Sequence, residues 1–318
     1  MELSDRKFLV MGGAGFLGSH VVEELAARDV PRDRIFVPRS AEYDLTEEDD
    51  VERVYRDAGP DVVVHLAATV GGIGANRRYP GRFFYDNMAM GLHVMEHARR
   101  HGVEKFVNIG TVCAYPKHTP VPFREEDLFE GYPEETNAPY GIANRALLVQ
   151  GWAYREQYDF EAIFLLPVNL YGPRDDFDPE TSHVIPALIR KCLEAKDAGQ
   201  DEIVAWGDGS PTREFFYVED AAEAIVTATE RYRDPEPMNL GTGREISIRE
   251  LLQTIVELTG YEGEIVWDTD KPNGQPRRCL DVSRARECLG FEASTDLREG
   301  LERTIAWYEE DRDRGPLR

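Results

Sequence analysis

The sequence predicts an α/β protein with a doubly wound parallel sheet, followed by a smaller C-terminal α/β domain. Three observations lead to this fold class. Short apolar runs, of the kind found in parallel strands buried on both faces, recur through the first half of the chain. Helical patterns lie between these runs, and a glycine-rich segment follows the first of them. After residue 172 the pattern changes and loops become more frequent.

Each element follows from its hydrophobic pattern. We expect strands at residues 8–11, 61–67, 105–109 and 162–166. The expected helices are 19–28, 91–101 and 140–158 in the first half, and 185–195, 220–231, 248–259 and 297–310 in the second. We therefore divide the chain into a first domain at 1–172 and a second at 173–318, and we expect some later segments to return to the first.

The composition limits the class of protein and its partners. With 318 residues, of which 42% are hydrophobic, the chain can bury a sizeable core without disulfides or a structural metal. Its 37 basic and 60 acidic residues give a net charge of −23, which argues against nucleic acid or an anionic membrane as a partner. An anionic ligand would therefore need a local group of cations.

The use of basic residues and cysteines bears on habitat and compartment. The cations are 31 arginines and only 6 lysines, a balance compatible with adaptation to high salt and also with simple compositional drift. The four cysteines form no CxxC pair, which suits a reducing compartment. We find no signal peptide and no apolar run near the ~20 residues of a membrane span, so we expect a cytoplasmic protein.

The glycine-rich segment GGAGFLG at residues 12–18 lies between the first strand and a helical pattern, where dinucleotides bind in Rossmann-type folds. Gly12 would permit the tight turn, Gly15 would let backbone N–H groups approach a pyrophosphate, and Gly18 would allow close packing of helix on strand. Phe16 and Leu17 complete this expected cofactor contact. A merely tight turn is the alternative interpretation.

The end of the next apolar strand indicates which dinucleotide binds. An acidic residue there would accept a hydrogen bond from a ribose 2′-OH, whereas Arg39 would pair with a 2′-phosphate. We therefore expect NADP(H) rather than NAD, with a solvated surface arginine as the alternative. Further residues expected beside the adenine and pyrophosphate are Asp44, Leu45, Leu66, Ala67 and Ala68.

A hydroxyl residue and a tyrosine follow the third strand. Thr111 comes after the strand at 105–109, and Tyr140 opens the helix at 140–158, which is the layout of a short-chain dehydrogenase/reductase. More specific motifs are HLAA (65–68), VGGI (70–73), VCAYPK (112–117), NLYGP (169–173), SHVIPALIRK (182–191) and WGDGSPTREF (206–215). With these motifs the chain resembles the GDP-L-fucose synthase family, from residue 8 to about residue 290.

This resemblance implies a reaction on GDP-4-keto-6-deoxy-D-mannose: epimerisation at C3 and C5, then NADPH reduction at C4. Cys113 and His183 match the family's acid–base pair, and the ordinary pKa values of a thiol and an imidazole, about 8.5 and 6.5, suit proton exchange near neutrality. Tyr140 would donate a proton to the C4 oxygen, and Thr111 would hydrogen-bond it. Without the resemblance, Cys113 would be interpreted as a small core residue and His183 as a surface residue or helix cap.

The resemblance also implies the ligand contacts. Further cofactor contacts are Tyr140, Asn144, Pro167, Asn169, Leu170 and His183. Contacts to the GDP-sugar are Asn169, Lys191, Trp206, Arg213, Lys271 and Asn273, the last replacing the family's usual aspartate. Arg213 suits a pyrophosphate because its planar guanidinium donates two parallel hydrogen bonds. The helices that follow residues 80 and 140 resemble the family's dimer-forming pair, which suggests a homodimer.

The sequence departs from the family at Asn144, where the family has a lysine one helical turn after the tyrosine. A lysine there lowers the pKa of the tyrosine and hydrogen-bonds the nicotinamide ribose, whereas asparagine supplies no charge. We expect the pKa of Tyr140 to stay near its ordinary value of about 10. We also expect Asn144 to weaken cofactor binding and to slow reduction, whereas epimerisation should be at least partly preserved. The alternative is that Asn144 is an engineered or sequencing change in an otherwise ordinary enzyme.

Two other functions stay open. One is a GDP-hexose epimerase that does not reduce, or an enzyme for another GDP-hexose. The other is a sugar-nucleotide-binding protein without catalysis, which Asn144 and Asn273 would permit. A pure binding protein would have little use for the full set of Cys113, Tyr140 and His183, so we favour an enzyme.

Three histidines share one face of the helix at 91–101. His93, His97 and His101 repeat every four residues, as metal ligands on a helix can. No carboxylate or thiol completes a site, and the expected chemistry needs no metal. We therefore predict no metal site and interpret these histidines as a solvated or interface face.

Overall fold

The computed structural model describes residues 1–71, 73–179, 181–271 and 275–314. Its centre is a sheet in the order β10-β5-β4-β3-β1-β2, in which every neighbouring pair is parallel. These strands are β1 (Phe8–Met11), β2 (Ile35–Phe36), β3 (Val62–His65), β4 (Lys105–Ile109), β5 (Ala162–Pro167) and β10 (Met238–Leu240). The strands that follow β1 lie on its two opposite sides, and such a reversal of order opens a crevice at the carboxyl edge of a sheet.

The side chains of β1 show why both faces of the sheet are buried. Phe8 and Val10 belong to one hydrophobic core, and Leu9 and Met11 belong to another. All four are at most 1% exposed, because successive side chains of a strand point to opposite faces. Burial on both faces requires the continuous apolar runs that the sequence contains.

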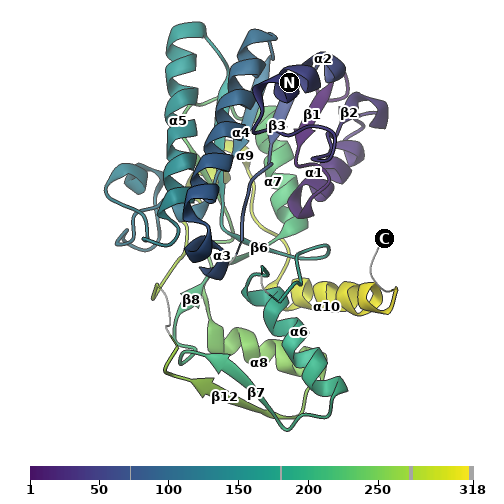
Figure 1. Cartoon of the computed structure of the whole chain (residues 1–318), viewed down its shortest axis with the longest axis vertical. Helices are drawn as coiled ribbons and strands as arrows, with labels where there is room; N and C mark the ends of the chain where they lie inside the picture. Colours follow the sequence, from purple (N-terminus) through teal and green to yellow (C-terminus); the bar gives the residue numbers. More distant parts are fainter. Residues whose placement is uncertain (72, 180, 272–274, 315–318) are drawn as a thin grey trace.

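Helices cover both faces of the sheet (Figure 1). On one face α1 (Phe16–Ala27) packs against α7 (Val218–Arg231). On the other face α2 (Glu48–Ala58) packs on α4 (Pro80–Arg100), and α4 lies beside α5 (Ala138–Tyr158). Shorter helical segments are η1 (Arg32–Arg34), α3 (Ile73–Arg78), η2 (Val112–Ala114), η3 (Glu125–Phe129) and α9 (Ser283–Leu289).

A second group of elements forms the lower part of Figure 1 and has its own core. Its helices are α6 (Val184–Asp197), α8 (Ile248–Thr259) and α10 (Leu297–Arg314). They accompany the parallel pair β7 (Glu202–Trp206) and β12 (Glu264–Asp268). Two more pairs are antiparallel β8 (Thr212–Arg213) with β11 (Ile246–Ser247), and parallel β6 (Asn169–Tyr171) with β9 (Phe215–Tyr217).

The predicted fold class is confirmed: the central sheet is parallel, with helices on both faces. The bounds predicted for β1, β4 and α8 agree with the structure, but α4 begins at Pro80 rather than at residue 91. β10 and α7 come from the second half of the chain and join the sheet and one of its faces. The division into 1–172 and 173–318 stays a prediction.

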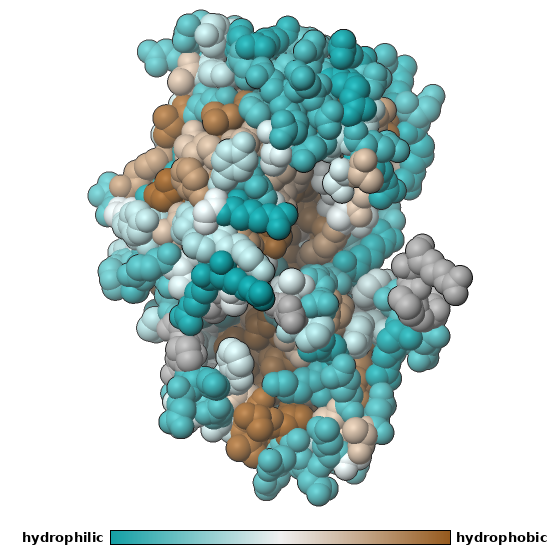
Figure 2. All heavy atoms as spheres, in the orientation of Figure 1, coloured by the Kyte–Doolittle hydropathy of each residue, from teal (hydrophilic) through white to brown (hydrophobic). Residues whose placement is uncertain are grey.

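The surface is mostly hydrophilic, with a hydrophobic patch over β7 and β12 (Figure 2). Val204, Trp206 and Val266 on these two strands are exposed. In the part of the chain that the structure describes, no helix combines the length and apolar character needed to cross a membrane.

Candidate active site

A cavity of about 1260 Å³ opens at the carboxyl edge of the parallel sheet, where the loops after β1 to β5 meet. It brings together the predicted residues Gly12, Gly15, Phe16, Leu17, Gly18, Arg39, Asp44, Leu45, Leu66, Ala67, Ala68, Thr111, Cys113, Tyr140, Pro167, Asn169, Leu170 and His183. Residues that are far apart in the sequence therefore line the same cavity.

The glycine turn has the geometry that a dinucleotide needs. Gly12 has a φ of +80°, and a Cβ there would lie 2.8 Å from the backbone nitrogen of Ala67. At Gly18 a Cβ would lie 2.0 Å from the carbonyl oxygen of Gly12, so only glycine lets α1 pack this closely. Gly15 is the N-cap of α1, and the free N–H groups of the first helical turn face the cavity where a pyrophosphate would lie.

The residues after β2 complete a site that fits NADP(H). Arg39, Asp44 and Leu45 line the same cavity as the glycine turn. A guanidinium can pair with a 2′-phosphate, although the acidic Glu42 and Asp44 line this cavity too. The assignment of the glycine turn to the pyrophosphate and of Arg39 to the phosphorylated ribose stays a prediction.

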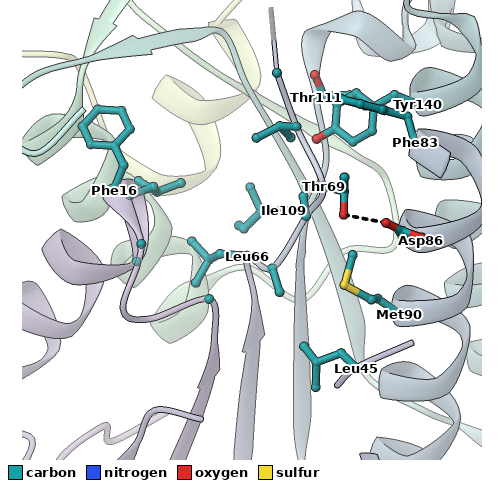
Figure 3. A pocket seen from close by; sticks show the side chains of 18 of the residues that line it. Phe16, Leu45, Leu66, Thr69, Phe83, Asp86, Met90, Ile109, Thr111 and Tyr140 are labelled. Carbon is teal, nitrogen blue, oxygen red and sulfur yellow. Dashed lines mark hydrogen bonds between the residues drawn. The ribbon is translucent and has the colours of Figure 1, made fainter. Parts of the chain in front are cut away.

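The four predicted reacting side chains, Thr111, Cys113, Tyr140 and His183, all line this cavity. Thr111 caps the short helix η2, and its Oγ1 accepts a hydrogen bond from the backbone N–H of Cys113 at 3.1 Å. Figure 3 shows Thr111 beside Tyr140, which projects from the first turn of α5. His183 is the N-cap of α6 and lines the cavity as well.

The surroundings of Tyr140 keep its phenol protonated. Burial raises its pKa well above the ordinary value, and the electrostatic influence of Cys113 raises it further. Hydrogen bonds from Asn144 and Thr111 act in the opposite direction and do not compensate. The expectation that the pKa would stay near about 10 is therefore wrong: desolvation dominates where no cation is present.

Asn144 lies one helical turn after Tyr140 and its side chain contacts that residue. Its side chain is 4% exposed, and its Nδ2 donates a hydrogen bond to the backbone carbonyl of Tyr140 at 3.0 Å. It is absent from the set of described residues that line the cavity. The amide therefore binds mainly within its own helix.

The imidazole of His183 has its pKa lowered from the ordinary value of 6.5. The protein around the ring removes water that would solvate the charged form, and this effect exceeds the attraction of Asp176. Near neutral pH the ring is therefore mostly neutral and able to accept a proton.

Arg278 is a site residue that the sequence analysis missed. Its Nη1 lies 3.7 Å from the Sγ of Cys113, and its Nη2 donates to Gln275 Oε1 at 3.0 Å. Gln275 in turn donates to the backbone carbonyl of Lys117 at 3.0 Å, which fixes this segment against the loop that carries Cys113. The pair of arginines at 277–278 was not a distinctive signal, because adjacent cations also occur at 77–78, 99–100 and 190–191.

The predicted substrate cations lie beyond the cavity. Arg213 on β8 has its pKa lowered to about 10, first by burial and then by repulsion from Arg278. Lys191 donates to the carbonyl of Val204 at 2.6 Å. These two cations do not line the cavity itself, as far as the described residues show.

An aromatic surface lies near the second group of elements. Trp206 at the end of β7 is 68% exposed, and Lys271 Nζ lies 5.6 Å from the centre of its ring. Asn169 lines the cavity, and its amide donates to the carbonyl of Glu214 at 2.8 Å. Asn273, and Gly72 of the VGGI motif, lie outside the described residues.

The cavity also has a wall that the sequence analysis did not predict. Thr69, Phe83, Asp86 and Met90 line it from α4 and from the loop before α3 (Figure 3). Because the prediction began the helix at residue 91, the first turns of α4 were treated as loop. A proline at the start of the helix, Pro80, was the signal that could have extended it.

Among the described residues, no group of three or more His, Cys, Asp or Glu side chains is placed to hold a metal ion. The alternative of a solvated face is wrong for His97, which is 2% exposed. The rings of His97 and His101 contact Tyr55 of α2, with centroid distances of 6.2 and 5.2 Å. His97 therefore packs in the interface between α2 and α4.

Comparisons with known proteins agree with this geometry. Residues 8–241 match the model of the NAD dependent epimerase/dehydratase family. The chain is 42% identical to GDP-L-fucose synthase 1 of Arabidopsis thaliana, over 96% of this chain and 95% of that protein. It is 37% identical to the GDP-L-fucose synthase of Escherichia coli K12, over 98% of this chain and 99% of that protein.

A solved structure of a GDP-L-fucose synthetase from Naegleria fowleri, bound to NADP, superposes with a TM-score of 0.90 at 28% identity. The match covers 98% of this chain and 96% of that one. The chain therefore belongs to the NAD-dependent epimerase/dehydratase family and, within it, to the GDP-L-fucose synthases.

Proposed function

We propose that this enzyme converts GDP-4-keto-6-deoxy-D-mannose into GDP-L-fucose, by epimerisation at C3 and C5 followed by reduction at C4. The observation that carries the proposal is that Thr111, Cys113, Tyr140 and His183 line one cavity beside the glycine turn. The relatives named GDP-L-fucose synthase support the substrate class.

Epimerisation uses the acidity that the 4-keto group gives to its two neighbouring carbons. Cys113 and His183 act as the acid–base pair, one removing a proton from one ring face and the other returning a proton to the opposite face. The guanidinium of Arg278 beside the sulfur favours negative charge on Cys113 once it has given up its proton. The same two residues would serve C3 and C5 in turn.

Reduction depends on the protonated phenol of Tyr140. When bound, NADPH supplies the hydride for C4. Tyr140 gives its proton to the C4 oxygen, and the Thr111 hydroxyl hydrogen-bonds the same oxygen. Because burial raises the pKa of Tyr140, the donor form is fully populated at neutral pH.

The GDP part is assigned to the cations outside the cavity. Burial and repulsion from Arg278 disfavour the charge of Arg213, and a diphosphate bound beside Arg213 would offset both effects. Lys191 adds a further charge, Trp206 and Lys271 form a surface for the base or sugar, and Asn169 faces the hexose. Asn273 keeps its sequence-based assignment to the substrate.

An epimerase with little or no reduction is the second candidate, and Asn144 favours it. The position supplies no charge to Tyr140, and Asn144 is not among the described residues that line the cavity, so cofactor binding and proton resupply are the steps that suffer. The acid–base pair for epimerisation is independent of this position.

One experiment separates these functions. The protein is incubated with the keto-sugar nucleotide in D₂O, with and without NADPH. Deuterium at C3 and C5 together with NADPH oxidation is the result expected for the full reaction. Deuterium incorporation without NADPH oxidation would support the epimerase. The absence of both signals would overturn both functions.

Three further assignments belong to this proposal. The chain acts as a homodimer in the cytoplasm, with α4 and α5 as the dimer surface. Leu92 on α4 and Val149 on α5 are exposed and apolar, and the two helices lie side by side. Residues 1–172 bind NADP and 173–318 bind the GDP-sugar, with β10 and α7 completing the first unit.

A further inference from the structure

Helix α4 presents a carboxylate to the cofactor cavity that the proposed reaction does not use. Phe83, Asp86 and Met90 lie three and four residues apart, so they share one face of the helix, and all three line the cavity. Figure 3 shows Phe83 at the end of the cavity that holds Tyr140, with Asp86 and Met90 following toward Leu45. Asp86 therefore lies between the reaction end and the adenine end.

Asp86 is held in place by its neighbours. Its Oδ2 accepts hydrogen bonds from Thr69 Oγ1 at 3.2 Å, the dashed line in Figure 3, and from Arg82 Nε at 3.1 Å. Thr69 is fixed through its backbone, because Asn87 accepts from its N–H and donates to its carbonyl, both at 2.9 Å. Among the described residues both hydrogen bonds of Asp86 end at Oδ2, which leaves Oδ1 as an available acceptor.

The chemistry of the available oxygen limits what it can bind. An ionised carboxylate only accepts hydrogen bonds, so it repels the phosphates of the dinucleotide and needs a donor. Between the nicotinamide and the adenine of NADP(H), the hydrogen-bond donors are the ribose hydroxyls, and carboxylates are their usual partners in dinucleotide sites. Three helical residues, a rise of about 4.5 Å, separate Asp86 from Phe83, and Figure 3 shows Phe83 beside Tyr140, which favours the ribose on the nicotinamide side.

Asp86 lies where it can compensate for the family's lysine that Asn144 replaces. The helices α4 and α5 pack side by side, so a side chain from either helix can approach a ribose bound between Tyr140 and Leu45. Asn144 on α5 is buried and bonded to the carbonyl of Tyr140. The only acidic side chain that lines the cavity from α4, within the described residues, is Asp86.

We propose that Asp86 binds a hydroxyl of the nicotinamide-side ribose of NADP(H), so that α4 supplies a ribose contact that position 144 of α5 does not. This inference rests on NADP(H) as the cofactor and not on the identity of the sugar substrate. It makes Asp86 a cofactor-positioning residue of the proposed reduction.

Equilibrium binding tests the proposal without catalysis. The dissociation constant of NADPH is measured by calorimetry for the whole protein and for Asp86→Ala and Asp86→Asn. Loss of a hydrogen bond to a charged group corresponds to a weakening of roughly tenfold for Asp86→Ala, and an amide oxygen that still accepts should limit the loss to about threefold for Asp86→Asn. The Asn variant also keeps the test valid if Asp86→Ala does not fold.

Adenosine 2′,5′-bisphosphate serves as the internal control ligand, because it carries the adenine half of the cofactor alone. Its affinity should stay within about twofold in both variants. Glu96→Gln is the matched control on the same helix: Glu96 pairs with Arg99 and Arg100 outside the cavity, and neither ligand should be affected.

A second substitution tests the relation to position 144. In Asn144→Lys, a lysine would bind the same ribose, so adding Asp86→Ala to this variant should cost less NADPH affinity than it costs in the native chain. Equal losses of NADPH and adenosine 2′,5′-bisphosphate in Asp86→Ala would overturn the proposal, and so would unchanged NADPH binding. A loss in the Asn144→Lys background as large as in the native chain would also contradict it. Because no substrate is present, failure of the proposed synthase reaction does not affect these readouts.

Discussion

The two sides of the reaction centre differ in how they handle charge. On the epimerisation side, Cys113 has the guanidinium of Arg278 at 3.7 Å, and His183 is mostly neutral and able to exchange a proton. On the reduction side, burial holds Tyr140 protonated, and Asn144 binds the helix backbone. If these residues act as proposed, one cavity combines groups that exchange protons with a proton donor held in its protonated form, so the two half-reactions should respond to separate substitutions.

The largest effect is expected from Cys113→Ala. Removing one member of an acid–base pair costs roughly 10² to 10⁴ in rate, so deuterium incorporation at C3 and C5 should fall by about 10³-fold. The NADPH dissociation constant should not change, because the proposed partner of Cys113 is the sugar and not the cofactor. Nuclear magnetic resonance of the sugar nucleotide in D₂O measures the exchange. Exchange at the native rate would show that Cys113 is not part of the pair.

Tyr140→Phe should produce the reverse pattern, with a smaller effect. Loss of the proton donor should lower the rate of NADPH oxidation by roughly 10²-fold, since water can replace it in part. Deuterium exchange should persist, because it needs only Cys113 and His183. Tyr154→Phe, on the same helix but hydrogen-bonded to Glu96, is the matched control. If exchange and reduction fell together in Tyr140→Phe, the two sides would not be independent.

The separation of the two sides was only partly predictable from sequence. The parallel sheet was predictable, because strands buried on both faces must be continuously apolar, as Phe8–Met11 is. Strand β7 was missed because only the alternate residues Ile203 and Ala205 are buried, while the exposed positions carry apolar Val204 and Trp206. Alternating burial reveals a strand only when polar residues occupy the exposed positions, and here apolar side chains occupy two of them.

The same limit applies to the candidate site. Motifs located Thr111, Tyr140 and His183, since each follows a strand or opens a helix. Arg278 was missed because its contact with Cys113 joins positions 165 apart in the chain, and no local pattern carries that information. The pKa of Tyr140 was misjudged for a related reason: a sequence identifies missing charges but not the desolvation that burial imposes.

Arg278→Gln sharpens the comparison from the epimerisation side. Without the guanidinium, negative charge on the sulfur loses a charge-assisted contact, so exchange at saturating substrate should fall by roughly tenfold. Arg278→Lys should recover part of the rate. Arg277→Gln is the matched control, because the Arg277 side chain is exposed and forms an ion pair with Glu245. An effect confined to substrate affinity would assign Arg278 to the diphosphate alone.

The smallest effect is expected from Asn144→Lys, which would make the reduction side resemble the epimerisation side by adding a cation. In the native chain the pKa of Tyr140 lies above its ordinary value, so its donor form persists and reduction should not decline between about pH 7 and 10 on its account. A lysine would lower that pKa, so the alkaline decline should begin at lower pH, while reduction near neutrality should rise about threefold through better cofactor binding. Single-turnover NADPH oxidation across this pH range measures both effects, and deuterium exchange should follow an unchanged pH profile. An unchanged pH profile of reduction would mean that desolvation alone sets the pKa of Tyr140. The residue at position 144 would then have no influence on the reduction step.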